Sequence, residues 1–158
     1  MTDLDVITQA GDWSRLDNPE ELVRRAVEAA VAVADRAAPD AEISLLLTDD
    51  AGVRALNRDW RGKDKATNVL SFPTPVQPGP PGPCHLGDIA LAYETLAREA
   101  EAQSKTLADH LSHLVVHGTL HLLGYDHELE AEAEIMEGLE VKALATLGIA
   151  DPYGDMAA

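Results

Sequence analysis

The segment from 117 to 127, HGTLHLLGYDH, constrains the fold of this chain more than any other part of the sequence. If the residues before it are helical, His117 and His121 lie one turn apart on one helix face and can bind a single ion. Gly124 is placed to end that helix, because glycine readily takes the left-handed conformation that reverses a chain. His127 can then return toward the other two imidazoles. The spacing therefore predicts a three-histidine metal site with one position open for water, as in catalytic zinc centres.

The helix that carries this segment is strongly apolar and is predicted to be the central buried helix. It is expected to begin near Ser104 or Thr106 and to end near Leu123. A last helix is predicted from about 129 to 147, with Leu129 among its inward-facing residues. Five glutamates on this last helix are interpreted as its solvated face. They are Glu130, Glu132, Glu134, Glu137 and Glu140.

The rest of the chain alternates between predicted strands and helices. Asn18 followed by Pro19 is a helix start signal, and Thr48 or Asp49 is expected to cap the next helix, whose apolar positions include Trp60. Strands are expected at 5–10, 43–47, 67–72 and 85–92, and further helices at 19–38, 50–60 and 93–102. The last two strands are predicted to pair antiparallel. The predicted fold is α+β, with a small mixed β-sheet of about four strands packed with about five helices and the metal site at the C-terminal end of the central helix.

Length and composition set the class of protein. The 158 residues fit one domain, predicted over residues 1–150, followed by a disordered tail at 151–158. The single cysteine, Cys84, excludes a disulfide framework within the chain. The start of the sequence lacks the basic and apolar regions of a signal peptide, and no apolar run is long enough to cross a bilayer. We therefore expect a soluble, cytoplasmic protein with no membrane association.

The formal charge of −16 argues against a protein that holds nucleic acid by a broad basic surface. Residues 54–65 are an exception, because they carry five basic and two acidic side chains, a net charge of +3. This basic cluster consists of Arg54, Arg58, Arg61, Lys63 and Lys65. It is interpreted either as a solvated helix face or as a local phosphate-binding site.

Position 118 separates this sequence from a known protease pattern. The three histidines and Gly124 match the spacing H-E-x-x-H-x-x-G-x-x-H, in which the glutamate is the general base. Here Gly118 occupies the glutamate position, so a peptidase of that type would lack its base. Glu128 follows the third histidine, but its direction is not set by the sequence.

Several other polar residues are candidates with more than one interpretation. His110 and His113 extend the histidine face backward, and His113 is interpreted as a neighbour of the ligands or a substrate contact in preference to a metal ligand. Asp126 either orients a histidine or caps a turn. Ser71 and Asp88 lie near predicted strand ends and either face a cleft or satisfy backbone groups.

The 117–127 segment resembles the signature H-G-x-L-H-L-x-G-Y-D-H of the YbeY family, bacterial metal-dependent endoribonucleases linked to ribosomal RNA maturation. Two further stretches resemble the family in the same order. Residues 56–73 are similar to its arginine-containing loop and following strand, and residues 87–89 are similar to its next strand. The resemblance thus extends from about residue 43 to residue 147.

This resemblance implies one zinc ion per chain, held by His117, His121 and His127, with Arg61 as the functional arginine in the substrate cleft. His117 and Arg61 are the expected catalytic residues, and Arg61, Lys63 and Lys65 the expected substrate-binding residues. The implied partners are single-stranded regions of ribosomal RNA and ribosome or small-subunit components. The implied roles are 16S ribosomal RNA maturation and ribosome quality control.

The residue chemistry agrees with such a hydrolase. A bound metal lowers the pKa of water to about 7 or polarises a phosphoryl oxygen, and the planar fork of arginine suits a phosphodiester. No residue is an obvious general base, so the nucleophile is either metal-bound hydroxide or the 2′-hydroxyl of the RNA. Two alternative functions remain open, a metallopeptidase-like hydrolase and a non-catalytic, zinc-containing ribosome assembly factor.

Overall fold

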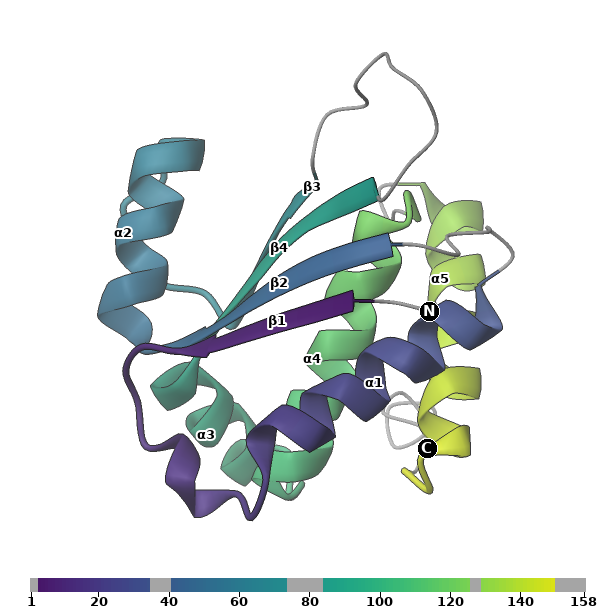
Figure 1. Cartoon of the computed structure of the whole chain (residues 1–158), viewed down its shortest axis with the longest axis horizontal. Coiled ribbons are helices and arrows are strands. Elements are labelled where there is room, and N and C mark those ends of the chain that lie inside the picture. Colours follow the sequence, from purple (N-terminus) through teal and green to yellow (C-terminus); the bar gives the residue numbers. More distant parts are fainter. Residues whose placement is uncertain (1–2, 35–40, 74–83, 126–128, 150–158) are drawn as a thin grey trace.

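The computed structural model describes residues 3–34, 41–73, 84–125 and 129–149, which form a mixed sheet and a set of helices (Figure 1). The four strands are β1 (Asp3–Thr8), β2 (Ala41–Thr48), β3 (Val69–Pro73) and β4 (Cys84–Ala92). The five α-helices are α1 (Pro19–Val33), α2 (Asp50–Arg61), α3 (Tyr93–Ala102), α4 (Leu107–Leu122) and α5 (Glu130–Thr146), and a short 3-10 helix, η1, spans Trp13–Arg15. The predicted α+β class is confirmed. The tail predicted at 151–158 lies outside the described residues.

The sheet has the strand order β1-β2-β4-β3. β1, β2 and β4 are parallel, whereas β3 pairs antiparallel with β4, as predicted. Ser71 of β3 lies opposite Ile89 of β4. Because β3 is an edge strand and successive side chains alternate between faces, its residues reach both sides of the sheet.

The two faces of the sheet carry separate apolar clusters. Leu45 and Ile89 point to the face on which α1, α4 and α5 form the main core. Their neighbours on the opposite face, Leu70 and Ala90, cluster with Val53 of α2. Figure 1 shows α2 standing on one side of the sheet, apart from α1, α4 and α5. The helices α2 and α4 therefore cover opposite faces.

Three side chains cap the N-termini of α1, α2 and α4. Asn18, Asp49 and Thr106 each accept a hydrogen bond from the backbone N–H three residues later, at 3.2, 2.8 and 3.0 Å. Each such bond satisfies one of the N–H groups that has no partner inside the helix. Of the alternatives predicted from the sequence, Asp49 and not Thr48 caps α2, and Thr106 and not Ser104 marks the start of α4.

Some predicted positions differ from the structure. β1 begins two residues before the predicted strand at residue 5. Leu129, predicted to face inward, is 64% exposed, because it precedes the first turn of α5. Trp60, predicted on the apolar face of its helix, is 75% exposed. Burial falls along α2 from Val53 through Leu56 to Trp60, because the helix diverges from the sheet (Figure 1).

Among the described helices, none combines the length and apolar character needed to cross a membrane.

Candidate metal centre

The two helical histidines lie in the last two turns of α4 and converge. Nε2 of His117 is 3.1 Å from Nε2 of His121, and the rings are edge-to-face, with centroids 4.6 Å apart. Two imidazole nitrogens bound to one tetrahedral zinc ion at about 2.0–2.1 Å would be roughly 3.3 Å apart. The two nitrogens therefore face one point at a spacing suited to a single ion.

The glycine turn after α4 forms where the sequence predicts it. Gly124 takes a φ of +97° immediately beyond the helix, and its N–H donates to the carbonyl of His121 at 2.9 Å. The predicted third ligand, His127, and its neighbours Asp126 and Glu128 lie outside the described residues. Within the described ranges no group of three candidate ligands occurs, so ligation by His127 stays a prediction.

A buried carboxylate from α5 contacts the histidine pair. Oε1 of Glu140 lies 2.5 Å from Nδ1 of His117, and Glu140 is 0% exposed. The prediction that Glu140 belongs to the solvated face of the last helix is wrong. Met136 and Leu144, four residues before and after it, are both buried, and residues four apart share a helix face. That spacing is the sequence signal that places Glu140 inside.

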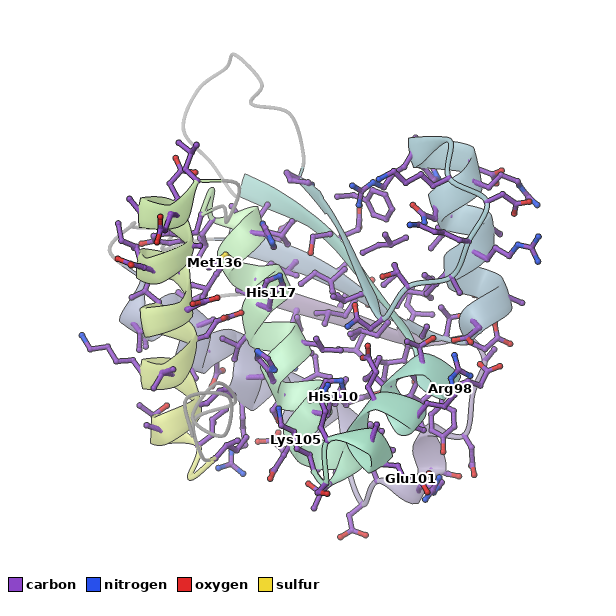
Figure 2. All side chains as sticks on the ribbon, turned by 180° about the vertical axis from the view of Figure 1, so that it is seen from behind. Arg98, Glu101, Lys105, His110, His117 and Met136 are labelled. Carbon is purple, nitrogen blue, oxygen red and sulfur yellow. The ribbon has the colours of Figure 1, made fainter. Side chains whose placement is uncertain are left out.

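Two more histidines precede the pair on α4; Figure 2 shows His110 and His117 along this helix. Nε2 of His113 is 3.8 Å from Oε1 of Glu140. Burial lowers the pKa of His113 to about 4, against the opposing effect of the Glu140 carboxylate, so this imidazole is neutral near neutral pH. Nε2 of His110 lies 2.9 Å from Oε1 of Glu99, which also accepts from Nδ2 of Asn68 at 3.0 Å. His110 thus joins α4 to α3, whereas His113 lies beside the Glu140 carboxylate that contacts the histidine pair.

At position 118 the helix packs directly on the sheet. A Cβ on Gly118 would lie 3.0 Å from Oγ of Ser71 and 3.2 Å from Cδ1 of Ile89, both closer than ordinary contacts. Glycine therefore permits the close approach of α4 to β3 and β4. A glutamate here would point into the sheet and away from His117 and His121. Ser71, whose orientation the sequence leaves open, faces α4.

The basic cluster lies on α2 and in the loop that follows it. Gly62 ends the helix with a φ of +70°, and Nδ2 of Asn57 donates to the carbonyl of Lys65 at 3.0 Å, which holds the loop against the helix. Arg61, Lys63 and Lys65 are all exposed. The loop backbone is thus fixed, while its cationic side chains extend into solvent.

Two of the five cations in the basic cluster are paired with carboxylates of the same region. Arg54 binds Asp64 through two hydrogen bonds of 2.7 and 3.1 Å, which lower the pKa of the Asp64 carboxyl. Arg58 binds Asp59 at 3.1 Å. Across the part of the chain that the structure describes, Arg61, Lys63 and Lys65 form no ion pair. These three are the cations best placed to meet phosphate.

The sheet stands between the basic cluster and the histidine pair. In Figure 1 both helices nevertheless end in the upper half of the molecule, α4 beside the start of β4 and α2 apart from the sheet. Arg61, the last residue of α2, and the histidines therefore lie toward the same end of the molecule. A cavity of about 380 Å³ lies between the C-terminal half of α2 and the sheet, with Trp60, Phe72 and Asp88 in its lining. Asp88 thus belongs to the α2 face and not to the histidine face.

The donor set fits a zinc ion. Imidazole nitrogen is a preferred zinc ligand, and a ligating histidine commonly donates its other ring N–H to a carboxylate, which is the position that Glu140 holds at Nδ1 of His117. His117 is only partly exposed, with 20% of its side chain accessible. The site is therefore sheltered but reachable, while the identity and number of ions stay predictions.

Comparison with known proteins agrees with these features. The sequence model of the family described as Endoribonuclease YbeY matches residues 8–148. A relative of that name from Bradyrhizobium sp. strain BTAi1 is 54% identical over 155 residues, which cover 96% of this chain and 92% of the relative. Another of that name, from Rhizobium meliloti strain 1021, is 53% identical over 161 residues, which cover 97% and 95%. The solution structure of TM1509 from Thermotoga maritima has a similar fold, with a TM-score of 0.53 and 23% identity over 94% of this chain and 92% of that one. The resemblance predicted from the sequence is confirmed, and the chain belongs to the Endoribonuclease YbeY family.

Proposed function

We propose that this chain is a metal-dependent endoribonuclease that cleaves single-stranded regions of ribosomal RNA in 16S maturation and ribosome quality control. The observation that carries the proposal is the 3.1 Å convergence of the His117 and His121 nitrogens in a member of this family. Relatives that share more than half of its residues are named for cleavage within an RNA strand. The proposed site of action is the cytoplasm, with ribosomal RNA and ribosome or small-subunit components as partners.

The residues of the centre would divide the work as follows. His117, His121 and His127 hold one zinc ion per chain, and Glu140 holds the ring of His117. When bound, the ion would supply Lewis acidity and a water of lowered pKa. The exposed guanidinium of Arg61 binds the phosphodiester and the charge that develops on it. His117 and Arg61 are thus the proposed catalytic residues.

Substrate binding is proposed to use Arg61 with Lys63 and Lys65. These three cations are exposed on a loop whose backbone is fixed, on a chain whose overall charge of −16 repels RNA. Because α2 and α4 cover opposite faces and both end in the upper half of the molecule in Figure 1, an RNA strand that bound both regions would cross the edge strand β3. A single strand is flexible enough to follow such a path, whereas a stiff duplex is not.

Metal analysis combined with an RNA cleavage assay tests this function. The purified protein is assayed on a single-stranded RNA and on the same RNA in a duplex, before and after chelation and after zinc is restored. Cleavage of the single strand that chelation abolishes and zinc restores supports the proposal. Cleavage that survives complete removal of metal would contradict it.

The same preparations distinguish the two alternatives. A metallopeptidase-like hydrolase would cleave an unstructured protein in a chelator-sensitive manner and leave RNA intact. The packing of Gly118 against Ser71 and Ile89 opposes this alternative, because it leaves no room for the protease base. A non-catalytic assembly factor would be indicated if a well-folded His117→Ala variant that binds no metal still supported growth in place of the parent.

A further inference from the structure

We propose that Glu140 is a positioning residue, which fixes the tautomer and ring orientation of His117 and so directs its Nε2 toward the metal. The inference rests on the proposed role of His117 as a ligand, and not on the identity of the substrate. It assigns a function to a carboxylate that lies on a different helix, 23 residues further along the chain.

The hydrogen bond itself selects the tautomer. Oε1 of Glu140 lies 2.5 Å from Nδ1 of His117. In the proposed arrangement the Glu140 carboxylate accepts the hydrogen bond, and Nδ1 of His117 carries the hydrogen. In a neutral imidazole the other nitrogen then holds the lone pair. That nitrogen is Nε2, the atom that lies 3.1 Å from Nε2 of His121.

The stability of the fold does not by itself explain why a buried carboxylate occupies position 140. Glu140 is 0% exposed and lies on the helix face that buries Met136, Ala143 and Leu144. A carboxylate removed from water is costly even when paired, and replacing a whole buried polar pair by apolar side chains of similar size is often neutral or stabilising. A purely structural contact between α4 and α5 would be served by apolar side chains at both positions. The carboxylate is explained by what it does to His117.

The neighbouring His113 does not replace His117 as the partner of Glu140. Its Nε2 is 3.8 Å from Oε1 of Glu140, beyond ordinary hydrogen-bond distance. The short contact in this group is therefore the one between Glu140 and the proposed ligand His117.

The test compares Glu140→Gln and Glu140→Leu with Glu137→Gln, a matched control on an exposed turn of the same helix. Zinc affinity is measured by competition with a chelating dye, and the tautomer of His117 by long-range nitrogen–proton NMR of the metal-free protein. Cobalt-substituted protein adds an absorption spectrum that reports ligand geometry. Melting temperatures show whether each variant is folded.

If Glu140 positions His117, Glu140→Gln weakens zinc binding by about 10- to 100-fold, reduces the Nδ1–H population of His117 and alters the cobalt spectrum. Glu140→Leu is expected to weaken zinc binding at least as much and also to lower the melting temperature, because it leaves Nδ1–H of His117 without its acceptor. Glu137→Gln is expected to leave all these quantities unchanged.

Wild-type zinc affinity and an unchanged Nδ1–H signal in a folded Glu140→Gln protein would overturn the proposal. So would a variant that loses melting temperature alone, because that result describes a structural role. Should Glu140→Leu fail to fold, Glu140→Gln, which keeps the size and polarity of the side chain, still decides. An absence of RNA cleavage by the wild-type protein would contradict the proposed function, whereas the affinity and tautomer effects would still establish the positioning role.

Discussion

The histidine centre and the basic cluster are built in opposite ways. In the histidine centre, distances of 2.5 and 3.1 Å join Glu140, His117 and His121, and burial of Glu140 is complete. In the basic cluster, Arg61, Lys63 and Lys65 extend into solvent from a fixed loop. The first region is arranged by packing before any ligand arrives. The second offers charge without a fixed side-chain geometry.

This difference indicates that metal binding and RNA binding, the two requirements of the proposed reaction, depend on separate regions of the molecule. A metal site needs ligand atoms held within a few tenths of an ångström, which packing of α4 against α5 and the sheet supplies. Phosphate contacts tolerate long, mobile side chains, because charge attraction extends over a Debye length. Changes in the first region should therefore alter metal binding, and changes in the second should alter only RNA binding and cleavage.

The largest expected effect follows from removing a ligand. His117→Ala or His121→Ala should abolish stoichiometric zinc binding and lower RNA cleavage by about a thousandfold or more, because several kcal/mol of charge stabilisation are lost. Metal content by mass spectrometry and cleavage rates measure both effects. His110→Ala is the comparison, since His110 contacts Glu99 and not the pair. A zinc-loaded, active His117→Ala protein would contradict the assignment.

The next effect should separate the two regions. Arg61→Ala is expected to keep the fold and the zinc content but to lower cleavage by about 100-fold, the usual effect of losing one group that stabilises developing charge. Arg24→Ala removes an equally exposed arginine from α1 and should leave cleavage unchanged. An Arg61→Ala protein that cuts RNA as fast as the parent would remove Arg61 from the site.

Acid should destabilise the histidine centre through His113. The pKa of His113 is lowered from 6.5 to about 4 in the folded chain, so between these values only the unfolded chain takes up this proton. The free energy of unfolding is therefore highest above pH 6.5 and falls as the pH drops toward 4. The loss at about pH 4 is about 3 kcal/mol. Urea unfolding of metal-free protein across this range measures the loss. The His113→Gln protein should show a flatter dependence, and an identical slope would contradict the assignment.

A smaller effect is expected from two matched glycines. Gly138→Ala should stabilise the chain by about 0.5–1 kcal/mol, because nothing lies within 4 Å of an added Cβ. Gly118→Ala gains the same helix propensity but crowds Ser71 and Ile89, for a net loss of about 1 kcal/mol. Chemical denaturation of both proteins gives the comparison. Equal stabilisation by both would show that α4 does not pack as closely as described.

The smallest effect concerns the paired cations. Asp64→Asn releases Arg54 from its exposed ion pair and should strengthen binding of single-stranded RNA by about twofold at low salt, with little change in melting temperature. Fluorescence anisotropy at two salt concentrations measures the gain, which should vanish at the higher one. Asp17→Asn makes the same change of charge at an exposed residue elsewhere. An equal gain from Asp17→Asn would attribute the effect to overall charge.

The structural features that the sequence predicted correctly depend on residues that are close together in the chain. The helix start at Asn18 is as expected, because a cap and its N–H partner are three residues apart. The turn at Gly124 and the proximity of His117 to His121 likewise depend on neighbours within one helical turn. Trp60 departed from its predicted place because burial depends on how far α2 follows the sheet, which no helical period encodes.

The sequence by itself determined the family, the class of fold and the helix face on which the two converging histidines lie, because residue order and the helical period act over short distances. Only the tertiary structure decided that Glu140 of α5 contacts His117, since this contact forms by packing of two helices. It also decided that the basic cluster lies across the sheet from the histidines, because the connections between the strands carry α2 and α4 to opposite faces. At Gly118, likewise, the proximity of Ser71 arises from chain segments 47 residues apart. Contacts between distant segments depend on the packed chain, and local sequence patterns do not specify them.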